Sequence, residues 1–137
     1  MTTCNDVMTS WPTCCVPEDV AATAAQLMHS QNIGSIPVID SIRTRKLIGI
    51  VTDRDLALRV VANGLDGNAV QVRAVMTGEI ATCHTGEDVQ VALDLMARHH
   101  LRRIPVVDDD QKIVGILAQV DVAARVNKSP KPPHWSR

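Results

Sequence analysis

The 137-residue sequence predicts an α+β fold made of two β-α-β-β-α repeats. Three observations support this prediction. Short motifs of the first half of the chain recur in the same order in the second half. Apolar runs of strand length alternate with stretches that have helical periodicity. A small sheet with helices on one side leaves an apolar face exposed, so we expect the repeats to be related by a pseudo-two-fold, with their sheets packed together and their helices outside.

Three motifs define the repetition. They are Val-Met-Thr at residues 7–9 and 75–77, Ile-Pro-Val at 36–38 and 104–106, and Gly-Ile at 49–50 and 115–116. Two units are too few for a solenoid, in which repeats stack in series. We therefore expect one repeat in residues 1–66, a second in residues 67–127, and a Pro-rich, basic and poorly ordered tail in residues 128–137.

The first repeat contains each expected element once. We expect an extended segment at 13–16, a helix at 17–31, strands at 37–40 and 47–51, and a second helix at 53–63. The first of these helices is predicted from the apolar stripe Val20, Ala24, Leu27 and Met28. Asn5 or Asp6 is expected to cap a short turn near the N-terminus, and Gly34 suits the end of the helix.

The second repeat follows the same order after a polar linker at 65–72. We expect an extended segment at 80–83, a helix at 87–99, strands at 104–107 and 113–117, and a last helix that ends near Val126. The helix at 87–99 is predicted to place Val89, Ala92, Leu93 and Met96 on one face.

Composition and charge exclude several classes of protein. The chain is 45% hydrophobic but has no Phe or Tyr, so the core must be aliphatic. A net charge of −1 lacks the basic character of most nucleic-acid-binding proteins. No apolar run is long enough for a membrane span and no signal sequence opens the chain, which predicts a cytoplasmic protein. The four cysteines are therefore not expected to form a disulfide framework.

The junction between the strand at 47–51 and the following helix is the most informative stretch. Thr52, three residues before Asp55, forms the capping-box pattern that opens a helix. The first N–H groups of a helix are unpaired and its dipole is positive there, so an anion can bind. A single such pattern is more often only a cap, but the repetition at Asp121 favours a functional role. Ala118 replaces Thr52 in the second copy, which predicts a weaker or altered site there.

Taken together, the motifs resemble a tandem pair of cystathionine-β-synthase-type (CBS) domains, the regulatory module also called a Bateman domain. They are Asp6-Val7-Met8-Thr9, Ile36-Pro37-Val38-Ile39-Asp40 and the run from Gly49 to Asp55, with their partners in the second half. The resemblance covers about residues 4–127. It implies that an adenosyl ligand, AMP, ADP or ATP above all, binds in the cleft between the repeats. It also implies a homodimer formed through the helices, no enzymatic activity, and signalling to a separate, unidentified protein.

The resemblance assigns ligand contacts to the strand–helix junctions. Asp55 and Asp121 would accept hydrogen bonds from ribose hydroxyls. Thr52 would hold phosphate at the start of the helix, within the run that also contains Asp53 and Arg54. Binding is therefore expected to be dominated by the site that contains Thr52 and Asp55.

Further contacts are implied just before and within the Ile-Pro motifs. Arg102 and Arg103 would reach the phosphates, because guanidinium groups pair well with phosphate oxygens, although a solvated charged loop is an equally good interpretation. The resemblance implies that the adenine is held between backbone and apolar side chains. The candidate segments are Thr13-Cys14, Ile36-Pro37, Ala81-Thr82 and Ile104-Pro105.

Two alternatives remain open. A thiol- or metal-responsive switch would use Cys14, Cys15 and Cys83, of which Cys15 and Cys83 occupy equivalent repeat positions. Their spacing matches no metal motif, and buried free thiols are the simpler interpretation. A ligand-free structural dimerisation module would show no response to nucleotides. No catalytic triad order, Walker loop or two-metal carboxylate cluster is recognisable, so no catalytic or metal-binding residue is assigned.

Overall fold

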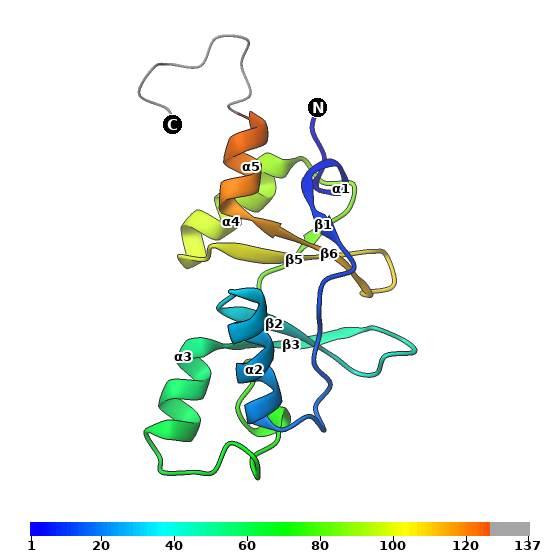
Figure 1. Cartoon of the computed structure of the whole chain (residues 1–137). Helices are drawn as coiled ribbons and strands as arrows, with labels where there is room; N and C mark the ends of the chain where they lie inside the picture. The colour runs from blue at the N-terminus through cyan, green and yellow to red at the C-terminus, as the bar shows by residue number, and fades with distance from the viewer. Residues whose placement is uncertain (127–137) are drawn as a thin grey trace, which may run out of the picture. The chain divides into compact units, whose positions relative to one another are not determined.

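The structure, a computed structural model, describes residues 1–126 (Figure 1). The tail predicted for residues 128–137 lies outside this range. The chain divides into two compact units. Unit 1 consists of Met1–Trp11, Ala81–Asp109 and the residues from Val114 onward, and unit 2 of Pro12–Ile80 with Asp110–Ile113. Each unit thus combines the body of one repeat with the opening segment of the other. The boundary between residues 66 and 67 that we expect from the sequence separates the two repeats along the chain and not the two compact units.

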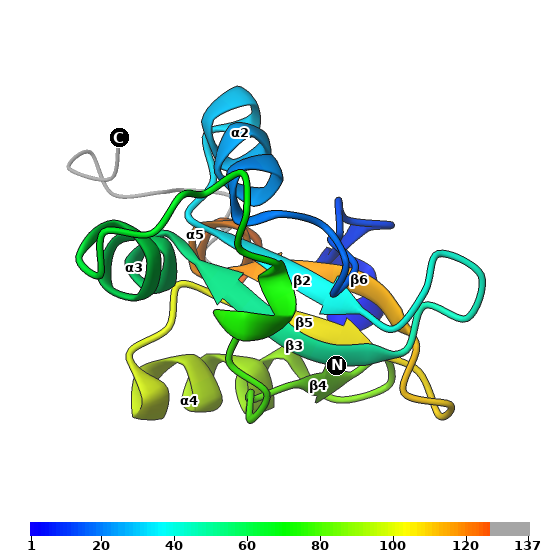
Figure 2. The same cartoon turned by 90° about the horizontal axis from the view of Figure 1, so that it is seen from below.

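Unit 2 is built on an antiparallel hairpin. Its elements are α2 (Ala21–Gln31), β2 (Ser35–Ile39), β3 (Leu47–Thr52), α3 (Asp53–Leu56) continued by the π-helical turn η1 (Ala57–Val61), and the 3-10 helix η2 (Val72–Ala74). Ile36 lies opposite Val51 in the hairpin, and the register shifts after Val38. The connection between the two strands extends from the end of the hairpin away from α3 (Figures 1 and 2).

Unit 1 has a four-stranded sheet in the order β1-β6-β5-β4. Its elements are α1 (Cys4–Val7), β1 (Thr9–Ser10), β4 (Cys83–His84), α4 (Val89–His99), β5 (Arg103–Val107), β6 (Ile113–Ala118) and α5 (Gln119–Val126). Strand β1 is antiparallel to β6, with Thr9 opposite Ile116. Strand β4 is parallel to β5, with Cys83 opposite Val106.

The same strand order recurs in unit 2, where single bridges replace the outer strands. Thr77 pairs antiparallel with Ile50 of β3, and Cys15 pairs parallel with Val38 of β2. Both bridges connect the residues that the sequence repeat aligns with the pairs of unit 1. The predicted α+β architecture of two equivalent repeats is therefore confirmed, although β1 itself was not expected from the sequence.

The recurring glycines and methionines belong to one packing feature. A Cβ atom on Gly49 would lie 2.8 Å from the carbonyl oxygen of Thr77 and 3.0 Å from Sδ of Met76. A Cβ atom on Gly115 would lie 2.7 Å from Cγ of Met8. In each unit, the Val-Met-Thr segment thus crosses the central strand at a position where only glycine leaves enough room. This contact explains why the two motifs occur together in both repeats.

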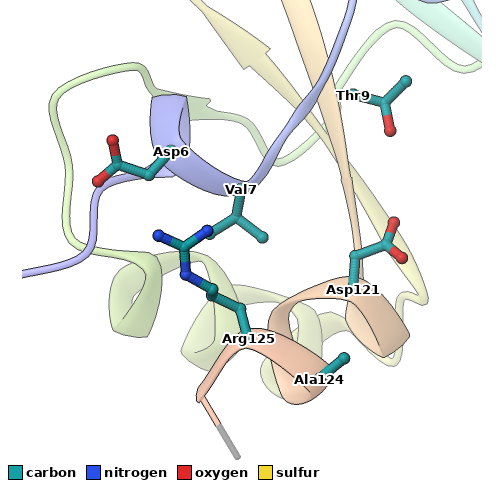
Figure 3. Close-up of a pocket in the computed structure, with 6 residues that line it drawn as sticks. All are labelled: Asp6, Val7, Thr9, Asp121, Ala124 and Arg125. Atoms are coloured by element: carbon teal, nitrogen blue, oxygen red, sulfur yellow. The ribbon is translucent and has the colours of Figure 1, made fainter. Parts of the chain in front are cut away.

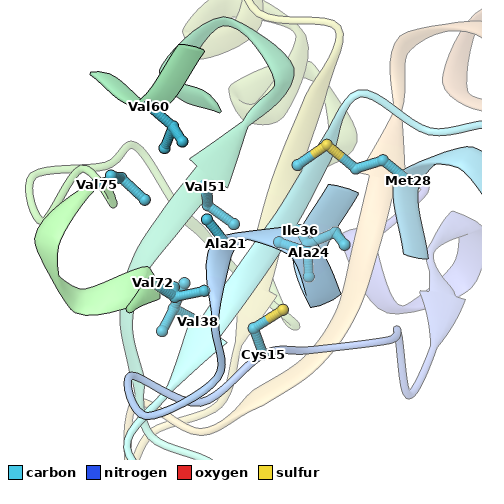
Figure 4. Packing of buried hydrophobic residues seen from close by; sticks show 10 residues of the cluster. All are labelled: Cys15, Ala21, Ala24, Met28, Ile36, Val38, Val51, Val60, Val72 and Val75. Carbon is cyan, nitrogen blue, oxygen red and sulfur yellow. The ribbon is translucent and has the colours of Figure 1, made fainter. Parts of the chain in front are cut away.

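The cores are aliphatic, as the composition predicts. In unit 2, Figure 4 shows the buried cluster of Cys15, Ala21, Ala24, Met28, Ile36, Val38, Val51, Val60, Val72 and Val75. In unit 1, the buried cluster contains Cys4, Cys83, Val89, Ala92, Met96, Ile104, Val106, Leu117 and Val122. Burial of each Val or Ile side chain contributes roughly 1.5–3 kcal/mol. The predicted helical stripes face these clusters, with Leu27 and Leu93 partly buried, except that Val20 precedes α2 and is not part of the cluster.

Helix ends differ from the predictions because nearby polar groups determine where a helix starts and where it stops. Helix α2 begins at Ala21 because the Asp19 carboxylate accepts the N–H of Val16 (3.0 Å), which forms a turn first. It ends at Asn32, in the left-handed region (φ 53°), rather than at Gly34. Thr3 caps α1, and Asp6 reciprocates by accepting the N–H of Thr3 (2.9 Å). None of the helices in residues 1–126 has the length and apolar character needed to cross a bilayer.

We predict that Gly49→Ala lowers the free energy of unfolding by about 1–3 kcal/mol, because the new methyl group meets a backbone carbonyl that cannot move freely. Urea denaturation measures the effect. Gly67→Ala in the same unit is the control, because its Cβ would only meet Ala22 at an ordinary distance of 3.7 Å. Equal stability of the two variants would show that the strand crossing at Gly49 can accommodate a methyl group.

Candidate functional site

The junction between β3 and α3 forms the capping box that the sequence predicts. The Thr52 hydroxyl accepts the N–H of Asp55 (3.0 Å), and the Asp55 carboxylate accepts the N–H of Thr52 (2.9 Å). The Asp55 side chain is only 12% exposed, and its other oxygen lies 3.8 Å from Nε of Arg59. The orientation of this carboxylate is therefore set before any ligand arrives.

Acidic groups dominate this junction. The N–H of Asp53 donates to the carbonyl of Gly34 (2.9 Å), and the Asp53 carboxylate accepts the N–H of Arg54 (2.7 Å). Two carboxylates in the first turn already complement the positive end of the helix. Arg59 donates to the carbonyls of Val75 (3.1 Å) and Met76 (3.2 Å), so its guanidinium group also has partners. The electrostatic attraction of this junction for an additional anion is therefore reduced.

The other predicted residues of unit 2 line the same sheet. Ile36 and Pro37 are buried in β2 next to β3, and the Pro37 carbonyl accepts the N–H of Cys15 (2.9 Å). The preceding Thr13 and Cys14 lie on the segment that this bond attaches to β2. Their side-chain hydrogen bonds go to Gln31, Pro12 and Arg45 rather than to the junction.

The junction between β6 and α5 in unit 1 has the same backbone connection but a different charge. The N–H of Gln119 donates to the carbonyl of Arg102 (2.8 Å), as Asp53 does to Gly34 in unit 2. Ala118 offers no hydroxyl, so the Thr52-type cap is missing. Arg102 and Arg103 stand where unit 2 has Gly34 and Ser35, so the segment bonded to the start of the eight-residue helix α5 carries two arginines.

Asp121 lines a pocket that lies within unit 1 (Figure 3). The lining residues are Asp6, Val7, Thr9, Asp121, Ala124 and Arg125. The backbone N–H of Thr3 lowers the pKa of Asp6, and the positive charge of Arg125 adds to this effect. Asp6 is therefore a carboxylate at neutral pH. The pocket thus presents two carboxylates, one guanidinium group and one hydroxyl.

The sequence interpretation missed Arg125 and the pocket-lining roles of Asp6 and Thr9. Arg125 follows Asp121 by the same spacing that separates Arg59 from Asp55, so the repeat itself contained this signal. Asp6 precedes and Thr9 ends the first Val-Met-Thr motif, which we interpret from the sequence as a sign of the repeat and of the family and not as part of a site.

The remaining predicted residues lie around β4 and β5. Ala81 and Thr82 are half-buried and precede β4, whereas Ile104 and Pro105 are buried in β5. The structure therefore brings the predicted residues into two sets, one in each unit, with matching positions in the two sheets.

The cysteines have unequal environments. Burial raises the pKa of Cys14, and it raises the pKa of Cys15 to about 12. The Cys83 thiol donates to the Pro105 carbonyl (3.8 Å), and the interaction between the Cys4 and Cys83 thiols lowers the pKa of Cys4 and raises that of Cys83. Cys4 was not among the predicted switch residues. Residues 1–126 contain no group of three or more His, Cys, Asp or Glu side chains placed to hold a metal ion.

Comparison with known proteins gives consistent matches. The CBS domain family model matches residues 4–62 and 72–128. CBS domain-containing protein YhcV of Bacillus subtilis is 38% identical over 123 residues, which are 90% of this chain and 84% of YhcV.

Two crystal structures extend the comparison. Hypoxic response protein 1 of Mycobacterium tuberculosis, solved with two coordinated zinc ions, is 32% identical with a TM-score of 0.80 and covers 89% of this chain and 97% of its own. CBSX2 in complex with AMP is 27% identical to this chain, with a TM-score of 0.78. The match covers 92% of this chain and 96% of CBSX2.

We predict that Thr52→Ala lowers the free energy of unfolding by about 1 kcal/mol, because the N–H of Asp55 loses its hydroxyl acceptor. Urea unfolding without ligand measures this loss. Thr52→Ser keeps the oxygen and should restore most of the stability. If serine destabilises the protein as much as alanine does, the methyl group and not the cap is what matters.

Proposed function

The chain belongs to the CBS domain family, and we propose that it is a regulatory module that binds an adenine nucleotide, AMP, ADP or ATP, or another adenosyl ligand. We further propose that it performs no bond chemistry and that its bound state is passed to a separate protein. The observation that carries the proposal is the repeated strand–helix junction, in which a carboxylate occupies the first turn of the helix in both units. The AMP complex of the similar protein CBSX2 supports the choice of ligand class.

For the phosphate, the charges favour the junction of unit 1. Arg102 and Arg103 precede β5, and the Arg102 carbonyl is bonded to the first N–H of α5. The remaining free N–H groups and the dipole of that helix attract negative charge, and guanidinium groups bind phosphate oxygens in pairs. At the junction of unit 2, the negative charges of Asp53 and Asp55 repel a phosphate, although the Thr52 hydroxyl can still donate its own proton in a hydrogen bond.

For the ribose, each unit offers one carboxylate. Asp55 has a fixed orientation because it belongs to the capping box, so little entropy is lost when a hydroxyl binds. Asp121 is exposed and lines the pocket of unit 1. The expectation that the site with Thr52 and Asp55 dominates remains a prediction, and comparison of the two aspartates tests it.

For the adenine, we propose the segments Thr13-Cys14, Ile36-Pro37, Ala81-Thr82 and Ile104-Pro105. Ile36 and Ile104 are completely buried. These two residues therefore act through their backbone groups and by fixing the strand position, whereas the half-buried residues can contact a ligand with their side chains.

We predict that AMP, ADP or ATP near millimolar concentration raises the melting temperature of the purified protein by several degrees. A ligand at about one hundred times its Kd adds about 2.7 kcal/mol to the folded state. S-adenosylmethionine and zinc complete the panel, because a shift with zinc alone would favour a metal-responsive module. A flat response to all adenosyl compounds would contradict the proposed function.

We predict that Arg102→Ala combined with Arg103→Ala weakens nucleotide binding about tenfold or more, because charge-assisted hydrogen bonds to phosphate are lost. Isothermal titration measures the Kd, with Arg98→Ala on the nearby end of α4 as the control. Asp55→Ala and Asp121→Ala are titrated in parallel. A much larger loss for Asp121→Ala would overturn the dominance of the Thr52 and Asp55 site, and unchanged affinity in the arginine variant would overturn the phosphate assignment.

We also propose that the protein is a homodimer. Leu58, Val61 and Leu65 are 51%, 74% and 49% exposed and follow helical spacing along and after η1. We expect Val61→Glu to convert the dimer to a monomer, as measured by size-exclusion chromatography with light scattering. Ile42→Glu is the control, because Ile42 is 78% exposed on the turn between β2 and β3. Dissociation by Ile42→Glu alone would place the interface elsewhere.

A further inference from the structure

Cys4 and Cys83 form a buried pair of thiols within unit 1. Their side chains are 0% and 1% exposed and belong to the same apolar cluster. Both cysteines are free, the Cys83 thiol donates to the Pro105 carbonyl (3.8 Å), and the neighbouring Cys4 thiol raises the pKa of Cys83. The site proposed above for an adenosyl ligand uses neither of them.

The backbone holds the two cysteines in place. The N–H of Cys4 donates to the carbonyl of Glu87 (2.8 Å), and the N–H of Asn5 donates to the carbonyl of Thr85 (3.0 Å). The opening segment therefore lies along the loop that directly follows β4, the strand that begins with Cys83. A parallel pair with Val106 fixes Cys83 from the other side.

We propose that Cys4 and Cys83 are an oxidation site at which a disulfide joins the opening segment of the chain to β4. Both thiols belong to one buried apolar cluster, and the backbone bonds of Cys4 and Asn5 to the loop after β4 limit the separation of the two cysteines. This proposal does not depend on a bound nucleotide.

The oxidant we propose is a peroxide. The Cys4 thiolate attacks one oxygen of hydrogen peroxide and the O–O bond breaks, which gives a sulfenic acid on Cys4 and a hydroxide; the hydroxide takes up the proton that the Cys4 thiol released and leaves as one water molecule. The Cys83 sulfur then attacks the Cys4 sulfur, the S–O bond breaks, and the departing hydroxide takes the Cys83 proton as a second water molecule. Two thiols are oxidised by two electrons and one peroxide is reduced. The lowered pKa of Cys4 is consistent with its role as the first nucleophile.

Access to the buried pair requires only local opening. Helix α1 has four residues and lies close to the N-terminus. A helix of this size opens locally at a small fraction of the total stability of a fold. A small oxidant can therefore reach Cys4 without global unfolding.

The test treats the reduced full-length protein with equimolar hydrogen peroxide. We expect the loss of two free thiols per chain, an intact mass lower by two hydrogen atoms, and a crosslinked peptide pair that contains Cys4 and Cys83. The melting temperature should rise by several degrees, because the disulfide closes a long loop of the unfolded chain. Reduction should reverse all of these changes.

The variants assign the reaction to this pair. Cys14→Ser with Cys15→Ser should keep the reaction, whereas Cys83→Ser should abolish the crosslink. Peptide mapping of the wild-type protein gives the same answer if Cys83→Ser does not fold. A crosslink through Cys14 or Cys15, a disulfide between two chains on a non-reducing gel, or four thiols left after treatment would overturn the proposal.

Discussion

The packing of a methionine from one repeat over a glycine from the other is the constraint on which both units depend. Met8 crosses β6 at Gly115, and Met76 crosses β3 at Gly49. Each crossing places the opening segment of one repeat at the edge of the sheet that contains the body of the other. A side chain at either glycine would push that segment outward. On the other side of each sheet, Cys83 pairs with Val106 and Cys15 with Val38, which are equivalent positions of the repeat.

Within this shared framework, the strand–helix junctions of the two units differ in charge. The start of α3 is self-capped and carries Asp53 and Asp55, whereas the start of α5 has no hydroxyl cap and lies next to Arg102. Because both junctions have the same backbone connection, a few substitutions are enough to change which part of a ligand each would favour.

The sequence allowed the strands, the main helices, the aliphatic core and the Thr52 capping box to be predicted, because each follows from a periodic pattern or a repeated motif. The start of α2 could not be predicted, since it depends on the Asp19 turn. Strand β1 and the contact of Cys4 with Cys83 join residues far apart in the chain, and no local pattern reports such pairing. The predicted ligand contacts rest on family resemblance, and the fold alone shows only that they form matching sets.

The grouping of Met1–Trp11 with the second repeat has a consequence for how the protein is made. During synthesis residues 1–11 leave the ribosome well before their strand partners on β6. The segment must stay unpaired until β6 has emerged, and such non-local contacts slow folding. Residues 1–11 therefore find their native partners late, whereas Pro12–Ile80 can start to fold while translation continues.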